Sequence, residues 1–154
     1  VRFLTVGNWL RDYKTLERLA EDYKGRVEFT VVGAKVRKSQ NVEVLSGISD
    51  KELFLLYQES SILFMPLNDA TANNAVLEAM SVGLPVLTTE GTGTEDYLGE
   101  DGIYYFSYEN LKSKVDEILS KKINLEKLSL AVEARAKKLD WKNTVFDYRE
   151  LYEI

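Results

Sequence analysis

Short apolar runs alternate along the chain with segments in which apolar residues recur at helical spacing. The apolar runs cover residues 2–7, 27–33, 42–45, 62–67 and 85–89, with a shorter one at 104–106. Runs of this length are typical of strands that are buried on both faces of a parallel sheet. In residues 14–24 the apolar positions lie at i, i+3, i+4 and i+7, which is one face of a helix. The alternation predicts an α/β fold, a doubly wound parallel sheet of five to six strands flanked by helices.

Several helix boundaries carry local signals. Ser49 followed by Glu52 fits a capping box that begins a helix. Asn73 or Asn74 is expected to cap a helix over residues 75–82, which Gly83 ends. Three more helices are expected after the last strand, with inward faces formed by Leu111, Val115, Ile118 and Leu119, then Leu125, Leu128, Val132 and Leu139, then Trp141, Val145, Tyr148 and Tyr152. No repeat or linker divides the pattern, so residues 1–154 are interpreted as a single domain.

Composition narrows the chemistry that this domain can perform. The 154 residues carry a net charge of −5, which disfavours nucleic acid as a partner, and they include no cysteine and no histidine. Disulfides, Cys/His zinc sites and Ser-His or Cys-His nucleophile pairs are therefore excluded. No run approaches the ~20 apolar residues of a transmembrane segment, and no signal peptide is visible, so a cytoplasmic location is expected. The start on Val1, inside the first strand, is what a domain cut from a longer protein would show.

The loops that follow the strands are the expected place for a ligand, because doubly wound sheets bind ligands beyond the carboxyl ends of their strands. Cations lie in the loops after the first and second strands, at Arg11, Lys14, Lys35, Arg37 and Lys38. They suit an anionic ligand such as a phosphate or a nucleotide, although ordinary solvated cations would give the same pattern.

The segment DATANNAVLE, residues 69–78, is more informative. Its small residues allow a ligand to approach the backbone, and the helix that follows offers N–H groups and a positive dipole end to a diphosphate. Glu78 lies one turn into that helix, where a carboxylate can accept hydrogen bonds from a vicinal diol such as that of ribose. The alternative interpretation is that Asn73 and Asn74 are only caps and Glu78 only a solvated surface residue.

Residues 69–89, DATANNAVLEAMSVGLPVLTT, resemble the donor-binding signature of the retaining glycosyltransferases of the GT-B fold, family four. The resemblance continues upstream through a VVG strand at 31–33, an NVxxL-G turn at 41–47 and an SDxEL helix with a tyrosine at 49–57. Downstream, GTGTE at 91–95 and the helix expected at 141–152 resemble later parts of that fold. The resemblance implies the C-terminal, nucleotide-sugar-binding lobe of a GT-B enzyme, Rossmann-like in fold, whose acceptor lobe is not in this chain.

This resemblance implies a role for each matched residue. Glu78 matches the second Glu of the family's Glu-x7-Glu motif, which binds the ribose hydroxyls, while Arg11 and Lys14 fall where the family grips the donor diphosphate. These three are the implied catalytic residues. The implied donor-binding residues are Gly7, Gly47, Ile48, Asp69, Thr71, Ala72, Asn73, Asn74, Glu78 and Glu95. No Asp-x-Asp occurs, so neither a metal nor another cofactor is expected; the nucleotide-diphosphate sugar is the substrate.

One departure keeps other functions open. Ala70 stands where the family has the first Glu of the motif, with Asp69 beside it. The expected function is metal-independent sugar transfer, of the retaining hexosyltransferase type, in which this domain alone binds the donor and transfers nothing. The alternatives are a non-catalytic nucleotide-, sugar- or partner-binding domain of the same fold, or one lobe of a GT-B phosphorylase or epimerase. A receiver-type signalling domain is disfavoured, because its acidic cluster after the first strand is replaced by Gly7-Asn8.

Overall fold

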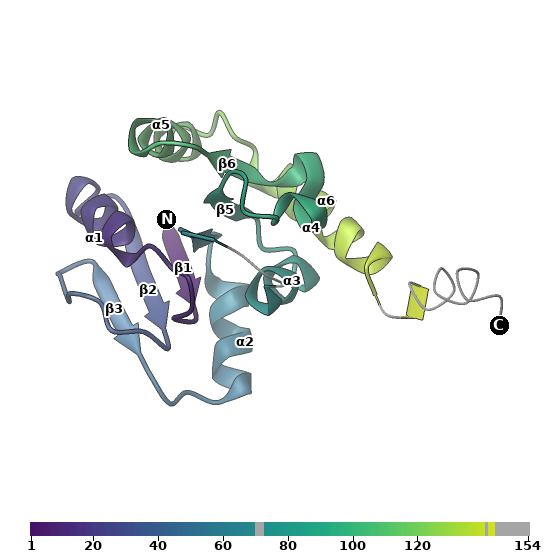
Figure 1. Cartoon of the computed structure of the whole chain (residues 1–154), viewed down its shortest axis with the longest axis horizontal. Helices are drawn as coiled ribbons and strands as arrows, with labels where there is room; N and C mark the ends of the chain where they lie inside the picture. Colours follow the sequence, from purple (N-terminus) through teal and green to yellow (C-terminus); the bar gives the residue numbers. More distant parts are fainter. Residues whose placement is uncertain (70–72, 141, 144–154) are drawn as a thin grey trace.

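Six parallel strands form one sheet. The computed structural model describes residues 1–69, 73–140 and 142–143. The strands are β1 (Arg2–Val6), β2 (Glu28–Val32), β3 (Val42–Leu45), β4 (Ile62–Met65), β5 (Val86–Thr89) and β6 (Ile103–Tyr105). They lie in the order β3-β2-β1-β4-β5-β6, and every pairing is parallel (Figure 1). This is the Rossmann order, which differs from the 2-1-3-4-5 order of receiver-type domains, so the predicted fold class is confirmed.

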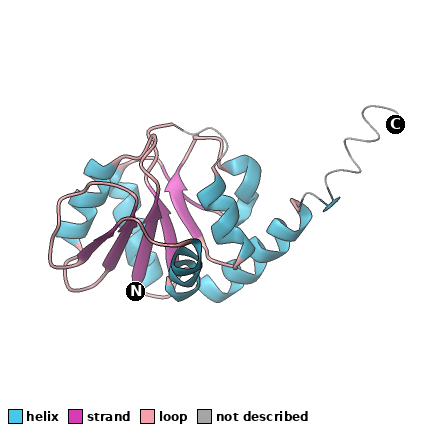
Figure 2. Cartoon of the chain, turned by 90° about the horizontal axis from the view of Figure 1, so that it is seen from below, coloured by secondary structure: helices cyan, strands magenta, loops and turns pink. Residues whose placement is uncertain are grey.

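Helices cover both faces of the sheet (Figure 2). They are α1 (Tyr13–Asp22), α2 (Asp50–Glu59), α3 (Asn74–Ser81), α4 (Glu95–Leu98), a short 3-10 turn η1 (Gly99–Asp101), α5 (Tyr108–Leu119) and α6 (Leu125–Lys138). Helices α1 and α5 pack on one face, and α2, α3, α4 and α6 pack on the other. The short helix α4 was not predicted, because four residues after a glycine-rich loop carry no helical periodicity.

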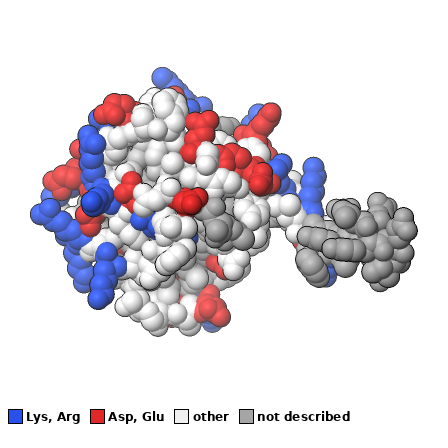
Figure 3. All heavy atoms as spheres, in the orientation of Figure 1, with Lys and Arg blue, Asp and Glu red and all other residues white. Residues whose placement is uncertain are grey.

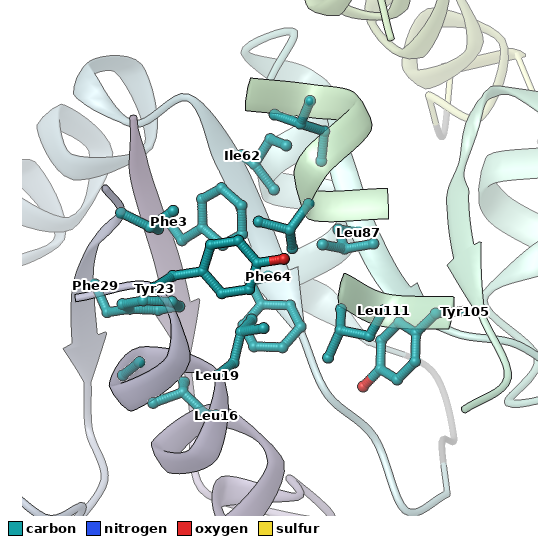
Figure 4. Packing of buried hydrophobic residues seen from close by; sticks show 14 of the residues in the cluster. Phe3, Leu16, Leu19, Tyr23, Phe29, Ile62, Phe64, Leu87, Tyr105 and Leu111 are labelled. Carbon is teal, nitrogen blue, oxygen red and sulfur yellow. The ribbon is translucent and has the colours of Figure 1, made fainter. Parts of the chain in front are cut away.

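Each strand contributes to two cores, since its side chains alternate between the faces. On β4, Phe64 points into the core beneath α1 and α5, whereas Leu63 and Met65 point into the other. Figure 4 shows the first of these cores, in which the rings of Phe3 and Phe29 meet edge to face with centroids 5.5 Å apart. Burial on both faces explains why the strands read as nearly continuous apolar runs.

Helix α6 departs from its predicted burial. Val132 is fully buried against the second core, while Leu125 and Leu128 are only partly buried, and Leu139 is 37% exposed. The reason is position, because Leu139 is the C-cap residue and lies beyond Ala136, which still packs partly against the second core. The helix expected over residues 141–152 falls almost entirely outside the described residues.

Local signals set the ends of α2 and α3. Ser49 and Glu52 form the predicted capping box of α2. Helix α3 ends in a Schellman motif, in which the N–H of Gly83 donates to Met80 and the N–H of Leu84 donates to Ala79. Across the residues described, none of the helices has both the length and the apolar character needed to cross a membrane.

Candidate functional site

The loops after β1 and β4 are joined at the carboxyl edge of the sheet. These strands are neighbours at the point where the strand order reverses, which is where Rossmann-like sheets bind their ligands. Arg11 forms an isolated antiparallel bridge with Leu67, and the N–H of Asp12 donates to the carbonyl of Pro66 at 2.7 Å. The N–H of Asn68 in turn donates to the carbonyl of Leu10 at 2.9 Å. The chain segment that leads into α3 is therefore held beside the loop that carries Arg11.

The guanidinium of Arg11 is held in place by three acceptors. Its Nε donates to the carbonyl of Val6 at 3.2 Å, its Nη1 to the carbonyl of Trp9 at 2.9 Å, and its Nη2 to Asn73 Oδ1 at 3.4 Å. A Cβ at Gly7, where φ is +86°, would stand 3.3 Å from Nη2, so glycine gives this side chain its space. Burial lowers the pKa of Arg11 from its ordinary value, opposed by Tyr13 and Tyr57, but an arginine remains charged at neutral pH.

The N-terminus of α3 faces the same place as Arg11. Asn73 occupies the N-cap position, but within the described residues its side chain makes no capping hydrogen bond; Oδ1 accepts from Arg11 instead. The expected N-cap position is therefore confirmed at Asn73, but its side chain does not make the capping hydrogen bond. The cause is Arg11, a stronger, charged donor than a backbone N–H. The first turn of α3 keeps N–H groups that no described side chain caps.

Glu78 lies one turn further along α3, and its side chain is exposed. The hydroxyl of Tyr57, on α2, donates a hydrogen bond of 2.8 Å to Glu78 Oε2. Glu78 thus presents a carboxylate to the solvent beside the first turn of α3.

These groups line one pocket of about 360 Å³, which we call the switch-point pocket. Its walls are formed by Val6, Gly7, Trp9, Leu10, Arg11, Leu53, Asp69, Asn73, Asn74, Ala75 and Glu78. It combines a fixed cation, a helix N-terminus and a carboxylate, which together suit a ligand that has an anionic group and hydroxyl groups. The volume lies within the range of about 300–1,000 Å³ that is usual for small-molecule sites.

The predicted site residues divide into three groups. The switch-point pocket brings together Gly7, Arg11, Asp69, Asn73, Asn74 and Glu78. Thr71 and Ala72, like Ala70, lie outside the described residues. The structure places the remaining four elsewhere: Lys14, Gly47, Ile48 and Glu95.

Lys14 lines a different, larger hollow of about 740 Å³ beside α1. Its neighbours there include Glu17, Arg18 and Arg37, so positive and negative charges alternate. Figure 3 shows Lys and Arg side chains gathered on this side of the molecule. The N–H of Arg37 also donates to Glu17 at 2.7 Å, which ties the β2–β3 loop to α1. The mixture of charges makes this hollow a solvated surface rather than an anion site.

Gly47, Ile48 and Glu95 have local contacts of their own. Gly47 has a φ of +67° in the exposed turn before α2, and Ile48 packs partly against the second core. Glu95 accepts a hydrogen bond from the N–H of Gly91, which closes the glycine-rich loop onto the start of α4. In the part of the chain that the structure describes, none of the three lines the switch-point pocket.

Trp9 and Tyr57 are two residues of this region to which the sequence assigned no role in the site. Trp9, at the rim of the pocket, is 74% exposed, and Leu10 beside it has a φ of +57°, which is unusual for a residue other than glycine. In the sequence, Tyr57 lies on the apolar face of a helical pattern, where a tyrosine is expected to be part of the hydrophobic core. A buried tyrosine hydroxyl nevertheless needs a hydrogen-bond partner, and this need could have indicated from the sequence that Tyr57 pairs with a polar residue.

A metal ion would need acidic side chains that are grouped closely enough to bind it. Among the described residues, no three Asp or Glu side chains are grouped so that they could hold a metal ion.

Comparison with known proteins defines the class and then the family. The fold is that of a Rossmann-like α/β domain, with a pocket at the point where the strand order reverses. The sequence matches the family model described as glycosyl transferases group 1 over residues 1–121. Because the match covers most of the chain, this chain belongs to the group 1 glycosyl transferases. Comparison with the sequences of curated proteins gave no significant match.

Solved structures with the same fold include three glycosyltransferases. Sucrose-phosphate synthase from Thermosynechococcus elongatus aligns with a TM-score of 0.81 and 18% identity over 99% of this chain and 44% of its own. WaaG, a glycosyltransferase involved in lipopolysaccharide biosynthesis, aligns with a TM-score of 0.72 and 24% identity over 90% of this chain and 43% of its own. The catalytic domain of cholesterol-α-glucosyltransferase from Helicobacter pylori aligns with a TM-score of 0.75 and 16% identity over 90% of this chain and 98% of its own.

At these identities the likeness establishes the fold, and the expected GT-B, family-four-like resemblance is confirmed. The chain spans less than half the length of the first two structures.

Proposed function

We propose that this chain is the donor-binding domain of a glycosyltransferase and that the switch-point pocket holds a nucleoside diphosphate sugar. The observation that carries the proposal is the pocket itself, in which Arg11 meets the start of α3 and Glu78, although Arg11 and the N-cap residue Asn73 are 62 positions apart in the sequence. Membership of the group 1 glycosyl transferases supports the same conclusion.

Each end of the pocket suits a different part of such a ligand. The guanidinium of Arg11 and the N–H groups of the first turn of α3 bind the diphosphate, because both present positive charge that is already oriented. The carboxylate of Glu78 accepts hydrogen bonds from the vicinal hydroxyls of the ribose. The sugar is placed toward the loop after β4, where Asp69 lines the pocket.

In the transfer reaction, the bond between the anomeric carbon and the diphosphate oxygen breaks and a bond to the acceptor oxygen forms. The nucleoside diphosphate leaves with the bonding electron pair and gains negative charge, and the proton of the acceptor hydroxyl passes to the departing diphosphate. Arg11 and the N-terminus of α3 stabilise that growing charge electrostatically, and this needs neither histidine nor a metal ion. We propose a retaining hexosyl transfer in a cytoplasmic enzyme whose acceptor lobe lies outside this chain, so the 154 residues alone bind the donor and transfer nothing.

Titration calorimetry with UDP, GDP and ADP, and with their glucose conjugates, tests this proposal. We expect at least one nucleotide to bind, and Arg11→Ala and Glu78→Ala each to weaken that binding about tenfold or more, the usual effect of removing a charged hydrogen-bonding partner. Arg37→Ala is the matched control, because it removes a cation beside α1 and should leave affinity unchanged. If no nucleotide of the panel binds the folded chain, the proposal is wrong.

Ala70 supports a second candidate, a domain that binds nucleotide without taking part in transfer. It stands where the resemblance expects the motif's first Glu. Restoring that carboxylate with Ala70→Glu distinguishes the two. For a donor domain, the substitution changes affinity for the glucose conjugate relative to the free nucleotide, whereas for a nucleotide-binding domain without sugar recognition both affinities stay equal.

A further inference from the structure

Tyr57 contacts the proposed donor site from outside it. The residue lies on α2, is only 3% exposed, and directs its hydroxyl across to α3, where it donates to Glu78 Oε2 at 2.8 Å. Tyr57 does not belong to the lining of the switch-point pocket among the described residues. It therefore acts on a ligand only through Glu78.

Glu78 separates two hollows. On one side is the switch-point pocket, with Arg11. On the other is a smaller hollow of about 190 Å³ between α2 and α3, lined by Asp50, Leu53, Phe54, Tyr57, Glu78 and Ser81. Tyr57 thus reaches the carboxylate from the side of the smaller hollow, and it occupies one lone pair of Oε2. Among the described residues, no hydrogen bond to Oε1 is found, and Glu78 lines the switch-point pocket, where a ligand can reach its carboxylate.

The hydroxyl of Tyr57 is a dependable donor. Burial, followed by the hydrogen bond to Glu78, raises the pKa of Tyr57 above its ordinary value, against the opposing charge of Arg11. The phenol consequently keeps its proton throughout the neutral range. An exposed glutamate otherwise rotates freely about three side-chain bonds, and a fixed donor restricts it to a small set of rotamers before any ligand arrives.

We propose that Tyr57 is a positioning residue that orients the Glu78 carboxylate toward the pocket. By doing so, it sets the preference of the pocket for a ribose diol over a deoxyribose. This inference rests on the proposed function, since it takes Glu78 as the group that binds the ribose hydroxyls. With Oε2 held by Tyr57, Oε1 and the remaining lone pair of Oε2 accept the two hydroxyl protons. The hydrogen bonds from Tyr57 and from the ribose then share one carboxylate and polarise one another.

The test is the effect of Tyr57→Phe on sugar discrimination. Calorimetry would compare UDP, GDP and ADP with their 2′,3′-dideoxy counterparts in the natural chain and in the variant. We expect Tyr57→Phe to weaken binding of the preferred ribonucleotide about fivefold to tenfold and to leave the dideoxynucleotide within about twofold. Because Glu78 is exposed, removing the hydroxyl leaves no buried charge unpaired, and thermal unfolding should show an intact fold.

Two controls separate this inference from the proposed function. Tyr104→Phe removes another tyrosine hydroxyl, which donates to the carbonyl of Gly99 at 2.7 Å and does not belong to the pocket. It should change the affinity for neither the ribonucleotide nor the dideoxynucleotide. Glu78→Ala should abolish the discrimination altogether. If the natural chain binds ribo- and dideoxynucleotides equally, the role of Glu78 in the proposed function fails. If Glu78→Ala abolishes discrimination while Tyr57→Phe keeps all of it, or lowers both affinities equally, then Tyr57 is only a structural residue and the inference alone is overturned.

Discussion

At the scale of single residues, the contacts of a cation matter more than its place in the sequence. Arg11 and Lys14 are three positions apart and were expected to act together on a diphosphate. The structure gives Arg11 three acceptors at the switch-point pocket and places Lys14 beside Glu17 on the outer side of α1. The sequence could not separate them, because Arg11 lies in the irregular turn after Leu10, whose φ is +57°, whereas Lys14 already belongs to α1.

The contacts of Arg11 predict that lysine cannot replace it. Lysine has a single ammonium group and cannot reach three acceptors in a plane. We expect Arg11→Lys to lower nucleotide affinity about tenfold, and Lys14→Ala to change it less than twofold. Calorimetry with the nucleotide that binds most tightly checks both. A large loss with Lys14→Ala would place Lys14 in the site and contradict the geometry.

Asn41 is a buried amide that holds the chain where β3 begins. It is 3% exposed, and its Nδ2 donates to the carbonyls of Ala20 and Val27, each at 2.9 Å. Asn41→Ala leaves both carbonyls without this partner, so we expect the free energy of unfolding to fall by about 2–3 kcal/mol. Urea denaturation measures it. Asn68→Ala, at an exposed asparagine, should stay within about 0.5 kcal/mol of the natural chain, and equal losses in both variants would refute the role given to Asn41.

At the scale of elements, local signals were predictable and packing between helices was not. The capping box of α2 and the glycine that ends α3 depend only on neighbouring residues, so the sequence identified both. The close approach of α6 to Gly83 involves residues 46 positions apart, because a Cβ on Gly83 would stand 2.9 Å from Ser129 Oγ. No periodicity in α6 signals that contact.

Alanine substitutions at Gly83 and Gly25 form a matched pair that measures how much the close approach of α6 to Gly83 costs when a Cβ is added. Both glycines have a positive φ, +71° and +76°, but a Cβ on Gly25 would meet nothing within 4 Å. Gly25→Ala should cost about 1–2 kcal/mol of the free energy of unfolding, from backbone strain alone. Gly83→Ala should cost about 1–3 kcal/mol more, because α6 must also shift. Urea denaturation of the two variants checks the difference, and equal costs would show that α6 moves away freely.

At the scale of the whole molecule, the class of sheet was predictable and the assembly of the site was only partly so. Apolar strands alternating with helices leave few arrangements other than a doubly wound sheet, and six strands were found in the Rossmann order. Parallel strands also bring their following loops to one edge, which correctly placed Arg11 beside the start of α3. The sequence did not reveal the bridge between Arg11 and Leu67, nor the bond between Tyr57 and Glu78, because both pair side-by-side segments that are far apart in the chain.

Tyrosines packed into the cores on the two faces of the sheet make the stability of the whole fold depend on pH in the alkaline range. Tyr105 is 5% exposed at the end of β6, and burial raises its pKa from 10.0 to about 12. Burial likewise raises the pKa of Tyr13 and of Tyr104 to about 12. A phenol with a raised pKa stays protonated in the folded chain while its unfolded counterpart ionises. Its stabilising contribution is therefore complete below pH 10 and is lost as the pH rises from 10 toward 12.

We accordingly expect the free energy of unfolding to be nearly constant from pH 7 to 9 and to decline above pH 10. Tyr105 alone contributes up to about 1.4 kcal/mol per pH unit to that decline, the free-energy equivalent of one pKa unit. Urea denaturation at half-unit steps from pH 9 to 11.5 measures the slope. Tyr105→Phe cannot ionise at this position, so it should make the decline above pH 10 less steep, with the remainder due to tyrosines such as Tyr13 and Tyr104. The variant should start slightly less stable at pH 7, because it loses the hydrogen bond from Thr89. Identical slopes for the variant and the natural chain would show that Tyr105 ionises in place, with the fold around it open enough to hydrate the phenolate.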